Sequence, residues 1–130
     1  MNPVRNYKNK KETSGEQISN GVKIFHKKLA EGRWFQFSLC EQLGNIGSEV
    51  NRAFRWKDKD QNNFESAINR ALELFDLTLK DPRWKKRLRE IARARELFCD
   101  AITGGEEYKS SLEDLDRYFF HYALCSRRNM

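Results

Sequence analysis

The run from Pro82 to Arg95 (PRWKKRLREIARAR) concentrates the side chains that bind phosphate groups. It holds seven Arg and Lys residues against a single acid, Glu90, so its formal charge of +6 equals that of the whole 130-residue chain. A solvated helix face normally interleaves both signs for pairing between residues four apart, which this run does not do. We therefore predict a nucleic-acid-binding surface. Its predicted members are Arg83, Lys85, Lys86, Arg87, Arg89, Arg93 and Arg95.

Three cations that precede this run, Arg52, Arg55 and Lys57, are added to the predicted surface. Phosphate contacts by six to ten side chains make binding strongly salt-dependent and largely independent of sequence. If Trp84 were exposed, it would stack on unpaired bases and favour RNA or single strands, whereas a position in the core is the favoured interpretation. Two alternatives stay open: a solvated helix face with no ligand, and a surface for an acidic protein partner.

Arg117 and His121 form the only arrangement suited to catalysis, because residues four apart stack on one helix face. Arginine would stabilise a phosphate and histidine would act as a general acid or base, which are the parts of a metal-independent ribonuclease. The pair resembles the Arg and His of HEPN-type ribonuclease domains, although the interval here is shorter than in that pattern. The favoured alternative pairs Arg117 with Glu113 or Asp114 and makes His121 a partly buried packing residue.

The other chemical signatures are weak, and we predict a protein that is not an enzyme and has no cofactor. The sequence lacks a glycine-rich phosphate loop, a CxxC, an HExxH and a nucleophile elbow. Cys40, Cys99 and Cys125 are interpreted as reduced thiols in the core, since they are three and widely spaced. A metal site formed by His121, Cys125 and Cys99 is a less favoured alternative.

Apolar residues recur at intervals of three and four from residue 34 onward, which predicts amphipathic helices that must position these side chains. Asp81 followed by Pro82 is a strong helix start. Gly44 and Gly47 indicate close approach of another backbone, with a kink as the competing interpretation. The predicted helices cover residues 33–57, 61–80, 82–103 and 111–127.

We therefore predict an all-α fold, an up-down-up-down four-helix bundle formed by residues 21–130 as a single domain. Residues 1–20 are polar and basic and are predicted to be a flexible arm. No stretch has the roughly 18 consecutive apolar residues of a membrane span, and no apolar segment follows the basic N-terminus, so a cytosolic protein is expected. Aromatic residues off the inward stripes suggest a subunit or partner interface. These are Trp34, Phe37, Trp56, Tyr118, Phe120 and Tyr122.

Two segments, GRWFQFSLCEQLGNIGSEV and NRALELFDLTLKDPRWKKRLREIARARE, carry a family resemblance that covers roughly residues 33–128. The chain resembles the accessory variability determinant proteins of diversity-generating retroelements and the proteins encoded by intervening sequences in bacterial large-subunit ribosomal RNA genes. The resemblance implies a ring-like homo-oligomer, such as a pentamer. It also implies a non-catalytic accessory protein that binds RNA, DNA or an RNA/DNA hybrid together with a reverse transcriptase.

Overall fold

The computed structural model describes residues 32–128, and the predicted arm over residues 1–20 lies outside them. Within this part the chain is entirely helical, without a β-strand. The elements in chain order are the 3₁₀-helix η1 (Arg33–Gln36), the α-helices α3 (Leu39–Trp56) and α4 (Gln61–Leu79), the 3₁₀-helix η2 (Pro82–Arg87), and the α-helices α5 (Leu88–Ile102) and α6 (Leu112–Arg128).

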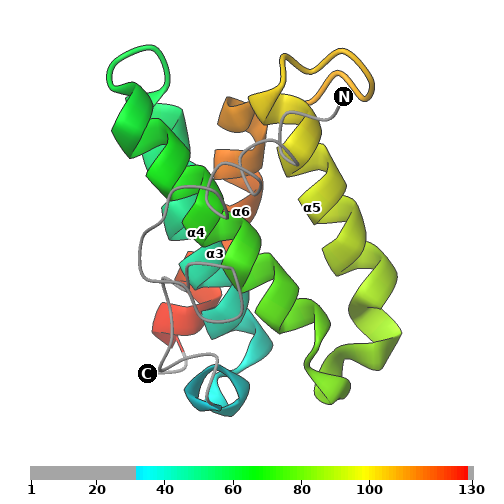
Figure 1. Ribbon diagram of the computed structural model, residues 1–130. Coiled ribbons are helices and arrows are strands. Elements are labelled where there is room, and N and C mark those ends of the chain that lie inside the picture. The colour runs from blue at the N-terminus through cyan, green and yellow to red at the C-terminus, as the bar shows by residue number, and fades with distance from the viewer. Residues whose placement is uncertain (1–31, 129–130) are drawn as a thin grey trace, which may run out of the picture.

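The four α-helices alternate in direction, which confirms the predicted all-α four-helix arrangement (Figure 1). The helix α3 packs along both α4 and α6, whereas α5 stands apart and meets α4 and α6 over a smaller part of its length (Figure 1). Each helix contributes large buried side chains to one core. They include Ile46 and Val50, Ile68 and Phe75, Ile91 and Phe98, and Leu115 and Phe119.

The first predicted helix, over residues 33–57, is in fact two elements. Phe37 has an extended backbone (φ −77°, ψ 149°) that ends η1. Ser38 then starts α3 with a capping box, in which the Glu41 N–H donates to Ser38 Oγ and the Ser38 N–H donates to Glu41 Oε1, at 3.1 and 3.0 Å. These bonds pair two of the backbone donors that an α-helix leaves open at its start.

Trp34 corrects the sequence interpretation, because it is fully buried rather than outside the core. Its Nε1–H donates to Thr78 Oγ1 on α4 at 3.0 Å. The error arose because the helical spacing was extended back through residues 33–37, which turn as a short 3₁₀-helix instead. Phe54 and Leu88 are apolar residues at the helical spacing, and both are nevertheless more than one-third exposed. The exposure of Trp56, Tyr118 and Phe120 agrees with their predicted place outside the core.

Gly44 and Gly47 allow α6 to approach α3 closely, as the first of the two sequence interpretations expected. A Cβ atom at Gly47 would lie 2.6 Å from the Phe119 Cβ, closer than two such atoms can come. A Cβ atom at Gly44 would lie 3.5 Å from the Ala123 Cα, which is an ordinary contact. Both glycines lie inside one continuous helix, so the kink is not observed.

Cys40 and Cys125 form a disulfide, so the prediction that they are reduced core thiols is wrong. Cys40 is in the first turn of α3 and Cys125 is near the end of α6. Because α3 and α6 are antiparallel neighbours, these two ends meet, with the Cα atoms 5.8 Å apart. Cys99, which is half-buried on α5, is not part of the disulfide, and its sulfur lies 3.9 Å from Arg95 Nη1.

The loop between α5 and α6 is organised by the buried carboxylate of Asp100. It accepts hydrogen bonds from the Ser110 hydroxyl at 2.6 Å and from the N–H groups of Glu107, Tyr108 and Ser110. The Ser110 bond is the main cause that lowers the pKa of Asp100. Gly105 follows the end of α5 and has a φ of +70°, a left-handed conformation that glycine adopts readily after a helix.

The two glycines of α3 give a matched pair of predictions. We expect Gly47→Ala to lower the free energy of unfolding by about 1–2 kcal/mol, because the overpacking against Phe119 exceeds the gain in helix propensity. Gly44→Ala keeps an ordinary contact and should raise it by up to about 1 kcal/mol. Urea unfolding followed by circular dichroism measures both. Equal effects of the two substitutions would contradict the close approach at Gly47.

Candidate nucleic-acid interface

The basic run begins in the 3₁₀-helix η2 and not in an α-helix. The Asp81 carboxylate caps it by accepting from the Arg83 N–H at 3.0 Å, with Pro82 in the first position, so the predicted start is correct. The backbone leaves helical geometry at Trp84 (φ −104°, ψ 24°) and at Arg87 (φ −111°, ψ 5°) before α5 begins. A single helical wheel over residues 82–103 therefore misplaces the side chains of η2.

The side chain of Gln42, fully buried on α3, fixes this segment in place. Its Nε2 donates to the Trp34 carbonyl at 2.9 Å and to Asp81 Oδ2 at 3.0 Å. Its Oε1 accepts from the Trp84 Nε1–H at 2.9 Å. The donors and the acceptor of one amide thus join η1, the Asp81 cap and η2, and this buried network (Trp34, Gln42, Asp81 and Trp84) holds the start of the basic run against α3.

Arg83 is part of this internal structure rather than of a free surface. Its guanidinium donates to both Asp81 oxygens, the shortest at 2.7 Å, and to the Phe37 carbonyl at 2.6 Å. These bonds are the main reason that the pKa of Asp81 is lowered. The Arg83 guanidinium also lies 4.4 Å from the Trp84 ring centre. Trp84 itself is half-buried against the core, as the favoured interpretation expected.

Arg87 is held by the one acid of the run. It donates to both oxygens of Glu90 at 2.9 and 3.0 Å, and Glu90 also accepts from the hydroxyls of Tyr118 and Tyr122 on α6, at 3.2 and 3.0 Å. The bond from Arg87 is the main cause that lowers the pKa of Glu90, while burial raises the pKa of Tyr118. The cluster links the beginning of α5 to α6.

Two further arginines of α5 are also engaged. Arg95 pairs with Asp76 of α4 at 3.1 Å. Arg93 lies 3.6 Å from Glu96 and places its guanidinium 4.3 Å from the Tyr108 ring centre. These contacts lower the positive charge that α5 offers to a ligand.

The remaining three cations of the run, Lys85, Lys86 and Arg89, are also exposed. Within residues 32–128 their side chains make no ion pair and no hydrogen bond, unlike Arg83, Arg87, Arg93 and Arg95 of the same run. They lie within five residues of one another at the junction of η2 and α5, and we call them the basic corner. Unpaired cations on an ordered backbone are the groups best suited to bind phosphate.

The other three predicted cations lie elsewhere. The end of α3 that carries Arg52, Arg55 and Lys57 is at the opposite end of the bundle from η2 (Figure 1). Arg52 pairs with the buried Glu49 at 2.6 Å, while Arg55 and Lys57 are exposed. The ten predicted residues therefore do not form one continuous surface.

Arg117 follows the favoured alternative of the sequence analysis. It pairs on its own helix with Glu113 at 2.7 Å and Asp114 at 3.8 Å, and its side chain is 70% exposed. His121 is exposed as well, which corrects the expectation of a partly buried residue. The metal site of His121, Cys125 and Cys99 is excluded, because the Cys125 sulfur is bonded to Cys40.

No family model, no curated protein and no solved structure matches the chain. In the described part of the chain, no three His, Cys, Asp or Glu side chains are grouped so that they could hold a metal ion. Every helix between residues 32 and 128 is too short or too polar to cross a membrane.

The buried network predicts that replacing the Gln42 amide lowers the stability of the fold strongly. Gln42→Leu leaves the Trp84 Nε1–H and the Trp34 carbonyl without partners, and we expect it to lower the free energy of unfolding by about 2–4 kcal/mol. Gln61→Leu is the control, because the exposed Gln61 bonds only to Glu65 on the surface of α4, and it should change stability by less than about 0.5 kcal/mol. Chemical unfolding measures both. A Gln42→Leu protein as stable as the control would show that the network does not hold η2.

Proposed function

We propose that this protein is a non-catalytic accessory protein that binds RNA through the phosphates, using the basic corner. The observation that carries the proposal is that Lys85, Lys86 and Arg89 are exposed and have no partner among residues 32–128, while the neighbouring arginines are engaged in internal contacts. The buried network fixes the segment that carries them, so little conformational freedom of the backbone is lost when a phosphate binds.

The side chains of the basic corner determine how it would recognise RNA. Lysine acts as a point charge toward phosphate and arginine adds a planar fork of donors, and neither reads base identity when it binds the backbone. The Trp84 ring packs on the core and has a guanidinium against it, so it is not offered to a base. We therefore expect binding that depends on charge more than on sequence and that extends to DNA and RNA/DNA hybrids.

The resemblance adds two parts to the proposal, a homo-oligomer such as a pentamer and a reverse transcriptase as protein partner, in the cytosol. Exposed aromatic side chains support an interface, above all Phe120, which is 56% exposed on α6, and Trp56 at the end of α3. Several copies of the basic corner on one assembly would strengthen RNA binding through multivalency without any new contact.

The ribonuclease alternative is weaker, because Arg117 is already paired with two acids of its own helix. Cleavage of RNA by the purified protein that is lost in His121→Ala would revive it. Binding of an acidic protein partner to the same cations is the remaining alternative.

The proposal predicts loss of RNA binding when the charge of the basic corner is reversed. Lys85→Glu/Lys86→Glu should weaken binding of an unstructured RNA at least about tenfold, because two phosphate contacts become repulsive. Lys59→Glu/Lys109→Glu makes the same change in net charge in two loops outside the basic corner and should keep most of the affinity. Fluorescence anisotropy measures both proteins, with circular dichroism to confirm the helical fold.

Equal losses in the two variants would show that binding follows net charge alone and would overturn the basic corner as the site. If the unmodified protein binds no RNA at low salt, the proposal is wrong and an acidic protein partner becomes the better explanation. Reversal of Arg87 or Arg93 is avoided in this test, since each also removes an internal contact.

A further inference from the structure

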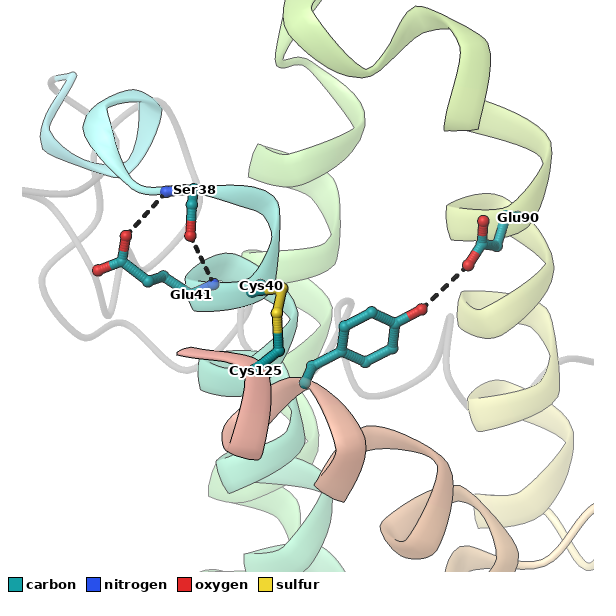
Figure 2. Close-up of a disulfide and its surroundings, with 6 residues drawn as sticks. Ser38, Cys40, Glu41, Glu90 and Cys125 are labelled. Carbon is teal, nitrogen blue, oxygen red and sulfur yellow. Dashed lines mark hydrogen bonds between the residues drawn. A yellow bond between two sulfur atoms is a disulfide. The ribbon is translucent and has the colours of Figure 1, made fainter. Parts of the chain in front are cut away.

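The disulfide lies at the end of the bundle where α6 finishes. Figure 2 shows Cys40 and Cys125 joined beside the start of α3, with Glu90 of α5 accepting a hydrogen bond nearby. Both cysteines are half-buried, so neither is enclosed in the core. In a reducing compartment a bond of this kind is usually transient and has a catalytic or sensing role.

The last turns of α6 contribute few buried side chains to the core. Phe119 is the final fully buried residue of α6, and positions 120–127 are half-buried or exposed, with Leu124 37% exposed. Besides the disulfide, this segment is held by the contact of Ala123 with Gly44 and by Tyr122, which packs on the edge of the core and bonds to Glu90. A segment with so few buried contacts is expected to open locally at low cost once the bond is broken.

The same segment positions the beginning of α5. Tyr122 of this segment and Tyr118, one turn earlier, donate to Glu90, which holds Arg87. Arg89 of the basic corner lies between Arg87 and Glu90 in the sequence. Next to this contact, a groove of about 370 Å³ separates α5 from α6 and is lined by Ala94, Leu97, Leu115 and Tyr118 among others. Packing between the two helices is therefore incomplete, and the tyrosine hydroxyls supply part of what joins them.

We propose that the Cys40–Cys125 disulfide is a redox switch for the basic corner, which rests on the function proposed above. A cellular dithiol or two molecules of a small thiol supply two electrons and two protons. The S–S bond breaks, two protein thiols form, and the reductant becomes a disulfide. The C-terminal half of α6 then loosens, Tyr118 and Tyr122 hold Glu90 less firmly, and the start of α5 gains freedom.

The switch makes the oxidised protein the stronger RNA binder. In the reduced protein, part of the binding free energy is spent on ordering the start of α5, and this lowers the affinity. A coupling between two sites of this kind typically changes affinity by about fivefold or more.

Hydrogen exchange of the full chain tests whether reduction loosens the end of α6 and the start of α5. Reduction, or Cys40→Ser/Cys125→Ser, should speed exchange over residues 120–128 and at the start of α5, while α4 and the middle of α3 stay protected. Cys99→Ser keeps the disulfide and serves as the control, with exchange like that of the oxidised protein. No change on reduction, or faster exchange throughout the bundle, would overturn the local switch.

RNA binding by the same proteins tests the regulation. The oxidised protein should bind an unstructured RNA about fivefold or more tightly than the reduced protein. Equal affinities in two forms that both bind would overturn the regulation and leave the proposed function intact. Absence of RNA binding in both forms would remove the proposed function, and the regulation with it, whereas the hydrogen-exchange result would still decide whether the disulfide clamps α6.

The double variant Tyr118→Phe/Tyr122→Phe tests the route of coupling, because it keeps the disulfide and removes both hydroxyls that bond to Glu90. We expect its affinity for RNA to match that of the reduced protein and to be the same before and after reduction. A redox dependence that persists in this variant would show that the tyrosines do not carry the coupling.

Discussion

One buried amide constrains the segment that begins the basic run. Gln42 is fully enclosed, so its polar atoms must be paired inside the protein. Its partners come from three segments: the Trp34 carbonyl, the Asp81 carboxylate and the Trp84 indole. Asp81 in turn holds Arg83. The basic run is thereby anchored at its first residues, and its unpaired cations follow directly after the anchor.

The structure divides the cations of the run, which look equivalent in the sequence, into those held by internal pairs and those left exposed. Arginine, with a planar fork of donors, suits internal pairs, and three of the five arginines in the run hold Asp81, Glu90 or Asp76 at 3.1 Å or less. Both lysines remain exposed. The formal charge of +6 is therefore a poor measure of what the surface offers, since the basic corner carries only three unpaired cations. Glu90, next to Arg89, connects the basic corner to α6 through the hydrogen bonds from Tyr118 and Tyr122. The same helix carries Cys125 of the disulfide.

Helical spacing was sufficient to predict four amphipathic helices. The Asp81–Pro82 pair predicted the start of the basic segment, and the glycines of α3 predicted the close approach at Gly47. Helical spacing could not locate the break between η2 and α5, because the apolar spacing continues across it. Pairing of arginines with Asp81 and Asp76 was missed because both acids lie outside the run. The disulfide could have been predicted from the sequence. An up-down-up-down bundle brings the start of its first helix, where Cys40 lies, next to the end of its last helix, where Cys125 lies.

The salt dependence of RNA affinity tests the central claim most directly, because it counts the phosphates that the protein engages. Three cations predict a slope of log K against log salt of about −2 to −3 for each protein chain bound. Engagement of all seven cations of the run would give about −5 to −6. The steeper slope would contradict the sorting of charges by internal pairs, and a slope near zero would contradict phosphate binding altogether.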